Sequence, residues 1–414
     1  MSGGLLIHLL RPLPLNGANC PIKDDEIWIQ QNWNILINLE NTILFSMKAI
    51  KSLGKKAVIK SDAPLPRLEV GQVLLRTIAV SGNPVDWKNV EFQWSADHAT
   101  LGCDVIGEII KFGPDVDTSD FHIGDVISSY VHGSSLRSPE NGAFAEYVAV
   151  DTKLSMHLPR KLNFSDSEHI SEGPVTTYEG AASISTSWYT AGALLFHHFN
   201  LKYTTPREPQ NSFPILIWGG TTAVGQALIQ LIRTFNGYSK IVVTASKKNE
   251  KLLKKYGADD VFDYHDPEVI AKIKAKYTDF RHLIDCVSSK ETIHQVYECS
   301  SDNGEATLLN LLMLSQDAIR PEIRKSNVKV DYTILYSAFG VDVKFSDWVI
   351  PADQSYRKSL IEFVKVINRL FLDGTLHHIP IKVYKNGLEG MIEIMDDLKY
   401  GRNSAEKLVA VMPH

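Results

Sequence analysis

The sequence predicts an α/β fold of two domains, an antiparallel β domain followed by a doubly wound parallel sheet. Between residues 47 and 151, short β-like runs are separated by Gly, Pro and Asn, as is typical of an antiparallel β domain. From residue 173 onward helical patterns alternate with apolar strands, which favours a parallel sheet. The apolar run 215–218 enters a glycine-rich turn and continues as a helix, which is how a dinucleotide-binding unit begins.

Composition limits the partners that the protein can have. The chain has 414 residues, 44% hydrophobic and 22% charged, with a net charge of −5. This length fits two domains, and a negative net charge does not favour binding to nucleic acid or to an anionic membrane. No apolar run reaches the roughly 18 residues that span a bilayer. We therefore expect a small-molecule substrate, no nucleic-acid or membrane partner, and a monomer or homodimer.

The cysteines indicate the compartment. The chain has four, which are scattered and include no C-x-x-C pair. They form neither a disulfide framework nor a zinc knuckle, so we expect a reducing compartment, the cytoplasm or the nucleus.

Residues 1–46 differ from the rest of the chain. Their short apolar run has no basic region before it, which argues against a secretory signal. We interpret the segment as an extension that is weakly ordered or that comes from an upstream start codon. Met47 is then the natural start of the folded protein.

The β-like runs and the C-terminal elements define the predicted domains. The β domain is expected over 47–175, the dinucleotide-binding domain over 176–345, and a return to the β domain over 346–414. A long helical pattern spans 353–373. The predicted strands of the β domain, including the two that return to it, are 72–80, 105–111, 125–127, 142–150, 381–384 and 407–411.

The glycine-rich turn is the first candidate binding site. Gly219 and Gly220 allow a tight turn and a close approach to a pyrophosphate, and Gly225 allows the helix to pack closely on the sheet. Thr222 stands where the G-x-G-x-x-G pattern has its middle glycine, so the motif depends on its context. The turn residues expected to contact a cofactor are Gly219, Gly220, Thr221, Thr222, Ala223, Val224 and Gly225.

The end of the next strand, 240–245, favours NADPH as the cofactor. An acid that would bind a free ribose 2′-hydroxyl is absent there. Ser246, Lys247 and Lys248 follow instead, a hydroxyl and two cations that suit a 2′-phosphate. The alternative is that both lysines are solvated residues at the start of a helix.

Several motifs in order resemble the medium-chain dehydrogenase/reductase superfamily over residues 47–412. They lie at 82–88, 101–108, 142–147, 218–225 and 256–264. The resemblance implies a chaperonin-10-like (GroES-like) β domain and a Rossmann domain. The motifs are similar to the zinc-independent branch, which includes quinone oxidoreductases, fungal trans-acting enoyl reductases and uncharacterised yeast proteins.

The departures from the zinc-dependent members are informative. Those members have a cysteine where this chain has Asn83, and Gly-His-Glu where it has Gly102-Cys103-Asp104. Their structural zinc lobe of four cysteines is absent. Cys103, Asp104 and Glu172 form a conceivable remnant of a catalytic zinc site, but the imidazole is missing and a free cysteine is usually a small buried hydrophobe. We expect no metal.

The resemblance also implies the catalytic residues. Asn83 and Trp87 are expected near the nicotinamide and the substrate, and Thr176 or Thr177 near the nicotinamide carboxamide. Each has a structural alternative: Asn83 precedes a proline and fits a turn, Trp87 fits a core position, and Thr177 fits a helix cap.

Further cofactor contacts are expected beyond the carboxyl ends of the strands, where doubly wound sheets bind their ligands. Cys286 and Val287 follow one such strand. The resemblance adds Tyr264 near the adenosine phosphate, Phe339 and Gly340 near the nicotinamide, and Lys407 as a phosphate contact. Tyr264 equally fits a surface position.

Three functions are compatible with these features. The first is an NADPH-dependent reductase of an activated C=C or C=O bond in an enal, enone, quinone or aldehyde, with hydride transfer that needs positioning rather than a metal. The second is a catalytically weak module that binds NADPH or a partner. The third is an enoyl reductase that acts in trans on a carrier-bound substrate.

Overall fold

The computed structural model describes residues 46–94, 96–158, 161–345 and 348–413, and the backbone of two short strands, β1 (Leu36–Ile37) and β2 (Ile43–Leu44). The chain divides into two compact units, Met1–Phe45 and Ser46–His414. In the first unit β1 pairs with β2 in antiparallel orientation. The expectation of weak order for residues 1–46 otherwise lies outside the described residues.

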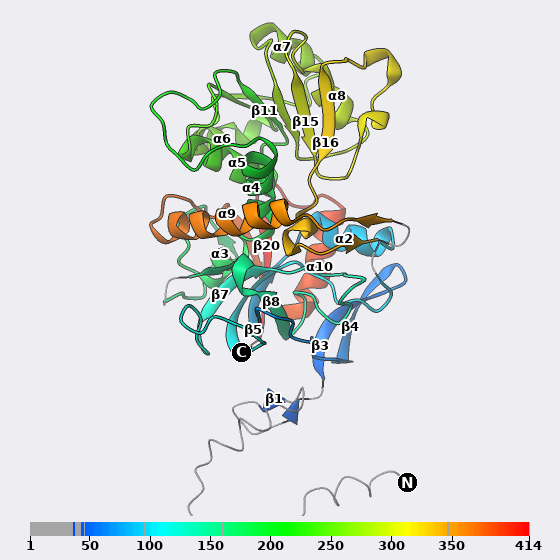
Figure 1. The fold of residues 1–414 in the computed structure, drawn as a ribbon, viewed down its shortest axis with the longest axis vertical. Helices are drawn as coiled ribbons and strands as arrows, with labels where there is room; N and C mark the ends of the chain where they lie inside the picture. The colour runs from blue at the N-terminus through cyan, green and yellow to red at the C-terminus, as the bar shows by residue number, and fades with distance from the viewer. Residues whose placement is uncertain are drawn as a thin grey trace, which may run out of the picture. The chain divides into compact units, whose positions relative to one another are not determined.

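The β domain of the second unit is built on an eight-stranded sheet (Figure 1). Its order is β10-β19-β20-β5-β6-β7-β9, and β8 also pairs with β5. The two strands from the end of the chain, β19 and β20, therefore lie beside strands from its first half. The strands are β5 (Gln72–Ser81), β6 (Asp104–Phe112), β7 (Val126–Tyr130), β8 (Tyr147–Asp151), β9 (Ser155–His157), β10 (His169–Ile170), β19 (Ile381–Tyr384) and β20 (Lys407–Val411).

One predicted strand is wrong in its first half. The pattern over 142–150 forms a strand only from Tyr147, where β8 begins. The preceding residues pair with a loop, because the backbone N–H groups of Ala143 and Phe144 donate to the carbonyl oxygens of Gly102 and Leu101. Alternating apolar residues fit a buried loop contact as well as a strand, so the periodicity does not separate the two.

Smaller elements complete the β domain. The hairpin of β3 (Met47–Leu53) and β4 (Lys56–Ala63) precedes the sheet. Helix α2 (Pro84–Glu91) follows β5, and α10 (Gly387–Lys399) packs against α2 and β20. A second hairpin joins β17 (Val343–Lys344) to β18 (Val349–Ile350).

The second sheet has six strands, all parallel, in the order β13-β12-β11-β14-β15-β16. Counted along the chain this order is 3-2-1-4-5-6, that of a dinucleotide-binding Rossmann sheet. The direction of progression reverses between β11 and β14, which defines the crevice for a ligand. The strands are β11 (Ile215–Trp218), β12 (Ile241–Thr244), β13 (Asp260–Phe262), β14 (His282–Asp285), β15 (Ala306–Asn310) and β16 (Val328–Tyr332).

Helices connect these parallel strands, as is usual for parallel crossovers, except between β15 and β16, where the connection contains 3₁₀ turns. The amphipathic helix α5 follows β11 and buries Leu228, Ile229 and Leu231. The connecting helices are α5 (Ala223–Thr234), α6 (Glu250–Tyr256), α7 (Val269–Lys276) and α8 (Thr292–Glu298), with the 3₁₀ turns η4 (Lys247–Asn249), η5 (Gln316–Ala318) and η6 (Pro321–Ile323).

One continuous hydrophobic core joins the two sheets. It includes Ile78 and Tyr130 of the β domain together with Ile215 and Ile241 of the parallel sheet. The elements between the sheets each contribute buried residues to it. They are α3 (Tyr178–Ala182), α4 (Thr186–Gly192), the π-helical segment η3 (Ala193–His198), η7 (Leu335–Phe339) and α9 (Gln354–Leu372), while η2 (Thr152–Leu154) lies at the end of β8.

Helix α9 confirms the predicted helix over 353–373 to within one residue at each end (Figure 1). Asp353 is its N-cap, accepting hydrogen bonds from the backbone N–H groups of Ser355 and Tyr356. Within the part of the chain that the structure describes, no helix is long and apolar enough to cross a bilayer.

Candidate functional site

A cleft of about 250 Å³ lies where the loops of the parallel sheet face the β domain. The β domain contributes the start of α2, the residue before β6 and the end of β7, and α4 contributes its first turn and Thr190. The parallel sheet contributes the segments that follow β11, β14, β15 and β16, which are the carboxyl ends of its strands. The lining residues are Asn83, Pro84, Val85, Lys88, Cys103, Tyr130, Thr186, Ser187, Thr190, Thr222, Ala223, Val224, Cys286, Val287, Leu311, Leu312, Thr333, Ile334, Leu335 and Tyr336.

The glycine-rich turn forms one wall of this cleft. Gly219 has φ +84°, a left-handed conformation that glycine adopts without steric cost. Thr222 is the N-cap of α5: its Oγ1 accepts from the backbone N–H of Gly225 at 3.0 Å and donates to the Gly219 carbonyl oxygen at 2.9 Å. The threonine at the middle-glycine position therefore closes the turn as a cap.

Gly225 is required by close packing. A Cβ atom at this position would lie 2.4 Å from the carbonyl oxygen of Gly219 and 2.9 Å from the Cα of Gly220. Both neighbours are backbone, so they cannot move aside as a side chain does. The helix start and the turn are thus held in contact by the absence of a side chain.

The residues predicted at the adenosine end lie together but outside the cleft. Ser246 Oγ donates to Tyr264 Oη at 3.2 Å, and Tyr264 is 45% exposed. The exposed Lys247 Nζ lies 2.5 Å from a carboxylate oxygen of Glu250, and its backbone N–H donates to Asp263 at 3.4 Å. The structure therefore groups the predicted hydroxyl and cation, and it adds two acids beside them.

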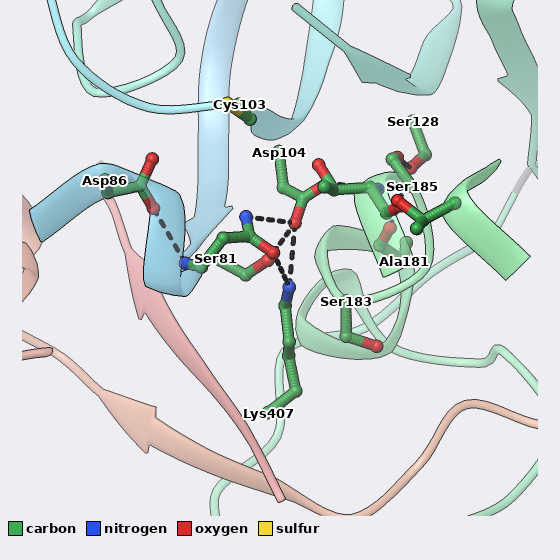
Figure 2. Close-up of polar contacts among 12 residues, drawn as sticks. Ser81, Asp86, Cys103, Asp104, Ser128, Ala181, Ser183, Ser185 and Lys407 are labelled. Atoms are coloured by element: carbon green, nitrogen blue, oxygen red, sulfur yellow. Dashed lines mark hydrogen bonds and ion pairs between the residues drawn. The ribbon is translucent and has the colours of Figure 1, made fainter. Parts of the chain in front are cut away.

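A buried polar cluster joins the starts of α2 and α4 to strands β5, β6 and β20 (Figure 2). We define the Asp104 cluster as Ser81, Asn83, Asp104, Thr186 and Lys407. Lys407 Nζ donates to Asp104 Oδ2 at 2.9 Å and to Asn83 Oδ1 at 2.6 Å. The Asp104 side chain is 0% exposed and that of Lys407 is 3% exposed. Lys407, predicted as a phosphate contact, instead forms a buried ion pair and does not line the cleft.

Asp104 is held ionised by its surroundings. Burial by itself raises the pKa of Asp104, but the Lys407 ammonium and the hydrogen bonds from Thr186 and Asn83 outweigh burial and lower that pKa overall. Nearby Asp86 has the opposite balance. Burial raises the pKa of Asp86 to about 8, against a hydrogen bond from the Asn83 backbone that lowers it. At neutral pH Asp104 is therefore the charged acid and Asp86 is mainly protonated.

Asn83 lines the cleft, but most of its side chain is used within the protein. Its Nδ2 donates to Asp104 at 2.8 Å, and its Oδ1 accepts from Lys407. It also begins α2 as N-cap and is 6% exposed. One N–H and one lone pair of the amide remain for a ligand.

Three residues predicted near the nicotinamide lie outside the cleft. Trp87 packs against the core of the β domain, and its Nε1 is buried with no partner among the described residues. Thr176 is exposed, and Thr177 caps α3 by accepting from the Gly180 backbone N–H at 3.0 Å. Trp87 and Thr177 thus take the structural roles, a core position and a helix cap, that the sequence also allowed for them.

The segment that follows β16 lines the cleft with residues that come earlier in the chain than the predicted ones. Phe339 stacks on Tyr130 with ring centroids 5.3 Å apart, and Gly340 ends η7 with φ +66°. Neither lines the cleft, whereas residues 333–336 do. The predicted Cys286 and Val287, after β14, do line it.

Several residues that line the cleft were not predicted from the sequence. Thr186 and Thr190 lie one turn apart on α4, and Thr190 Oγ1 donates to the Thr186 carbonyl oxygen at 2.7 Å. Two hydroxyls at i and i+4, on one face of a short and mostly buried helix, were the available signal. Among the described residues that line the cleft, Lys88 is the one with a positively charged side chain. Burial lowers the pKa of Lys88.

The conceivable zinc ligands do not come together. Asp104 pairs with Lys407, and Glu172 pairs with Lys255 at 2.5 Å. Burial raises the pKa of the Cys103 thiol, so it stays protonated. Among the described residues, no group of three His, Cys, Asp or Glu side chains is placed to hold a metal ion. The donor set therefore does not fit a catalytic zinc, which needs three protein ligands.

The chain is similar to known proteins over most of its length. Family models for the alcohol dehydrogenase GroES-like domain and for zinc-binding dehydrogenases match residues 69–160 and 223–343. An uncharacterised protein of Saccharomyces cerevisiae, YNL134C, is 50% identical over 368 residues, which are 89% of this chain and 98% of that protein. The trans-enoyl reductase poxP of Penicillium oxalicum is 33% identical over 360 residues, 86% of this chain and 89% of that protein.

A solved structure has the same fold. The mycobacterial protein Rv1454c, described as complexed with NADPH, is 20% identical and has a TM-score of 0.61. The match covers 88% of this chain and all of that one.

Proposed function

Because this chain belongs to the medium-chain dehydrogenase/reductase superfamily, and is thus an oxidoreductase, we propose that it reduces an activated C=C or C=O bond by hydride transfer from NADPH, without zinc. The substrates proposed are enals, enones, quinones or aldehydes. The observation that carries the proposal is the cleft itself. It joins the helix start that follows β11, at the reversal point of the parallel sheet, to side chains of the β domain.

The residues present fit a dinucleotide. The first N–H groups of a helix have no partner within it. Thr222 caps that of Gly225, while Ala223 and Val224, the first two residues of α5, line the cleft. Their N–H groups and the positive end of the helix dipole suit a pyrophosphate. The absence of a side chain at Gly219 and Gly225 lets the turn and the helix start pack this closely.

NADPH rather than NADH is proposed from the adenosine end. Ser246 and Lys247 lie at the end of β12 beside Tyr264, and the sequence has no acid at that strand end. The solved mycobacterial relative is described with NADPH. Glu250 and Asp263 also contact Lys247. The variant Lys247→Asp therefore distinguishes a lysine that binds a phosphate from a solvated, ion-paired lysine.

A bound nicotinamide supplies the hydride. The chain holds the acceptor in reach of the nicotinamide, which is the main requirement of such a transfer. Val85, Leu311 and Ile334 give the cleft its apolar surface, and Asn83 and Thr190 bring polar groups to it. After hydride transfer, a proton from solvent completes the reduction of the acceptor oxygen or carbon.

The test is the oxidation of NADPH, followed by its absorbance, with a panel of enals, enones, quinones and aldehydes. Turnover with any member supports the enzyme and rejects a module that only binds NADPH. Tight NADPH binding without turnover would reject the enzyme. Metal analysis of the active protein tests zinc independence, since bound zinc in equimolar amount contradicts it.

A second candidate is an enoyl reductase that acts in trans on a carrier-bound substrate. It is favoured by the 33% identity to a fungal trans-enoyl reductase over most of both chains. Reduction of a carrier-tethered enoyl thioester, with none of the free thioester, would support it over the first. Under either function we expect the cytoplasm or nucleus, no nucleic-acid or membrane partner, and a monomer or homodimer.

A further inference from the structure

The Asp104 cluster joins the two elements that form one wall of the cleft. We propose that the buried Asp104–Lys407 ion pair is a positioning device that fixes Asn83, at the start of α2, and Thr186, at the start of α4. Both residues line the cleft. The inference rests on the proposed function, because it names what holds the substrate cleft in shape.

Asp104 acts on α4 as a cap supplied from far away in the sequence. Its Oδ1 accepts from the backbone N–H and from the hydroxyl of Thr186, both at 2.6 Å. The N-cap residue of α4, Ser185, makes no side-chain capping bond. A carboxylate at this point satisfies a free N–H and complements the positive end of the helix dipole. Strand β6 therefore fixes where α4 begins.

Lys407 acts on Asn83. The ammonium donates to Asn83 Oδ1 at 2.6 Å, while Asn83 Nδ2 donates to Asp104 Oδ2 at 2.8 Å. A flipped amide would place its NH₂ group against the ammonium and its oxygen against the carboxylate, which both charges oppose. The pair thus selects one orientation of the amide that faces the cleft.

The charges of the cluster are balanced. Lys407 contributes one positive charge and Asp104 one negative charge, and Ser81 Oγ adds a neutral hydrogen bond to Asp104 at 2.9 Å. Asp86 is mainly protonated at neutral pH and so adds little charge, and the Cys103 thiol is neutral. Removing one partner leaves an uncompensated buried charge, whereas removing both does not. This difference allows positioning to be separated from stability.

The test compares Lys407→Met, Asp104→Asn and the double variant with the wild type. The double variant is expected to fold with a thermal midpoint near that of the wild type, since it carries no unpaired charge. Its kcat for an enone is nevertheless expected to fall at least tenfold, with the NADPH dissociation constant within twofold. Hydrogen exchange is expected to rise at least tenfold in peptides covering 83–91 and 183–192, and to stay unchanged over 223–234.

Lys399→Met is the matched control. Lys399 pairs with Glu91 at 2.8 Å, at the far end of the same helix α2, and neither residue lines the cleft. This variant is expected to keep wild-type kcat and wild-type exchange over 183–192.

A double variant with wild-type kcat and wild-type exchange in both segments would overturn the inference, because stability would then be the whole role of the pair. If the wild-type protein shows no turnover, the proposed function fails, and the exchange measurement alone decides on the positioning role. Faster exchange confined to 83–91 and 183–192 supports it, and unchanged exchange there rejects it.

Discussion

Gly225 shows how a single position controls the turn. A valine there would place its Cβ 2.4 Å from a backbone oxygen, so α5 would have to move away from the glycine-rich turn. We expect Gly225→Val to lower NADPH affinity at least a hundredfold in a fluorescence titration. Gly173→Val is the control, because a Cβ at Gly173 meets nothing within 4 Å. Retained affinity in Gly225→Val would contradict this placement of the pyrophosphate.

Lys247 tests the choice between NADPH and NADH. Lys247→Asp replaces a cation beside Ser246 with an acid, which disfavours a 2′-phosphate and suits a free 2′-hydroxyl. We expect the ratio of kcat/KM for NADPH over NADH to fall at least tenfold. Lys251→Asp, at an exposed position of α6, makes the same charge change and is expected to leave the ratio within twofold. An unchanged ratio in Lys247→Asp would show that its ion pair with Glu250 is its whole role.

His282 links stability to pH. Its Nδ1 lies 2.7 Å from Tyr238 Oη, its ring stacks on Phe199, and burial lowers the pKa of His282 to about 4. Below pH 6.5 the unfolded chain binds a proton here that the folded chain does not, so stability falls until about pH 4. Between pH 7 and pH 5, the free energy of unfolding of the wild type is therefore expected to fall by about 2 kcal/mol more than that of His282→Gln.

Urea unfolding at the two pH values measures this difference. His122→Gln, at an exposed position beside Asp125, serves as the control for removal of a histidine that is not buried. An equal loss in His282→Gln and the wild type would show that another group dominates the acid response.

Residue identities alone predicted part of the site. The turn 219–225 and the pair Cys286–Val287 depend on local pattern and strand ends, which the sequence displays. The roles of Thr177 and Thr190 depend on which helix faces the cleft. Both threonines lie in or beside short, mostly buried helices, so only packing between the sheets distinguishes them.

At the scale of elements, α9 ties the β domain to the segment that enters the cleft. Arg357 donates to Asp151 Oδ2 at 2.7 Å, at the end of β8, and to the Ala338 carbonyl oxygen of η7 at 3.0 Å. Both charged side chains are largely buried, at 21% and 13% exposed. We expect Arg357→Met to lower the free energy of unfolding by about 2 kcal/mol, as for hydrogen bonds to charged groups.

Urea unfolding measures this loss, and Arg369→Met on the exposed face of the same helix is the control. A loss below about 0.5 kcal/mol, the range of ordinary surface substitutions, would show that the contact adds nothing to stability. The existence of α9 was predictable from its helical period. Its partners were not, because they lie up to 206 residues away in the chain.

At the scale of the whole molecule, residues 46–414 form a compact unit without the preceding segment. Deletion of residues 1–46 is therefore expected to leave the thermal midpoint within about 2 °C, which for a chain of this size is a stability change of no more than about 1 kcal/mol. NADPH affinity should also be unchanged. Thermal unfolding and a cofactor titration measure the two quantities on the full chain and the shortened one. Loss of soluble protein on deletion would contradict Met47 as the start of the folded enzyme.

The two-domain α/β fold, the Rossmann turn and helix α9 were predictable from the sequence alone, because periodicity, glycine placement and capping act over a few neighbouring residues. The partners of Asp104 and Lys407, which are 303 residues apart, were set by the tertiary fold. That fold brought β20 beside β5 and so turned a predicted phosphate contact into a buried ion pair. A buried charge needs a partner from wherever the fold supplies it, and no local pattern records which residue that is.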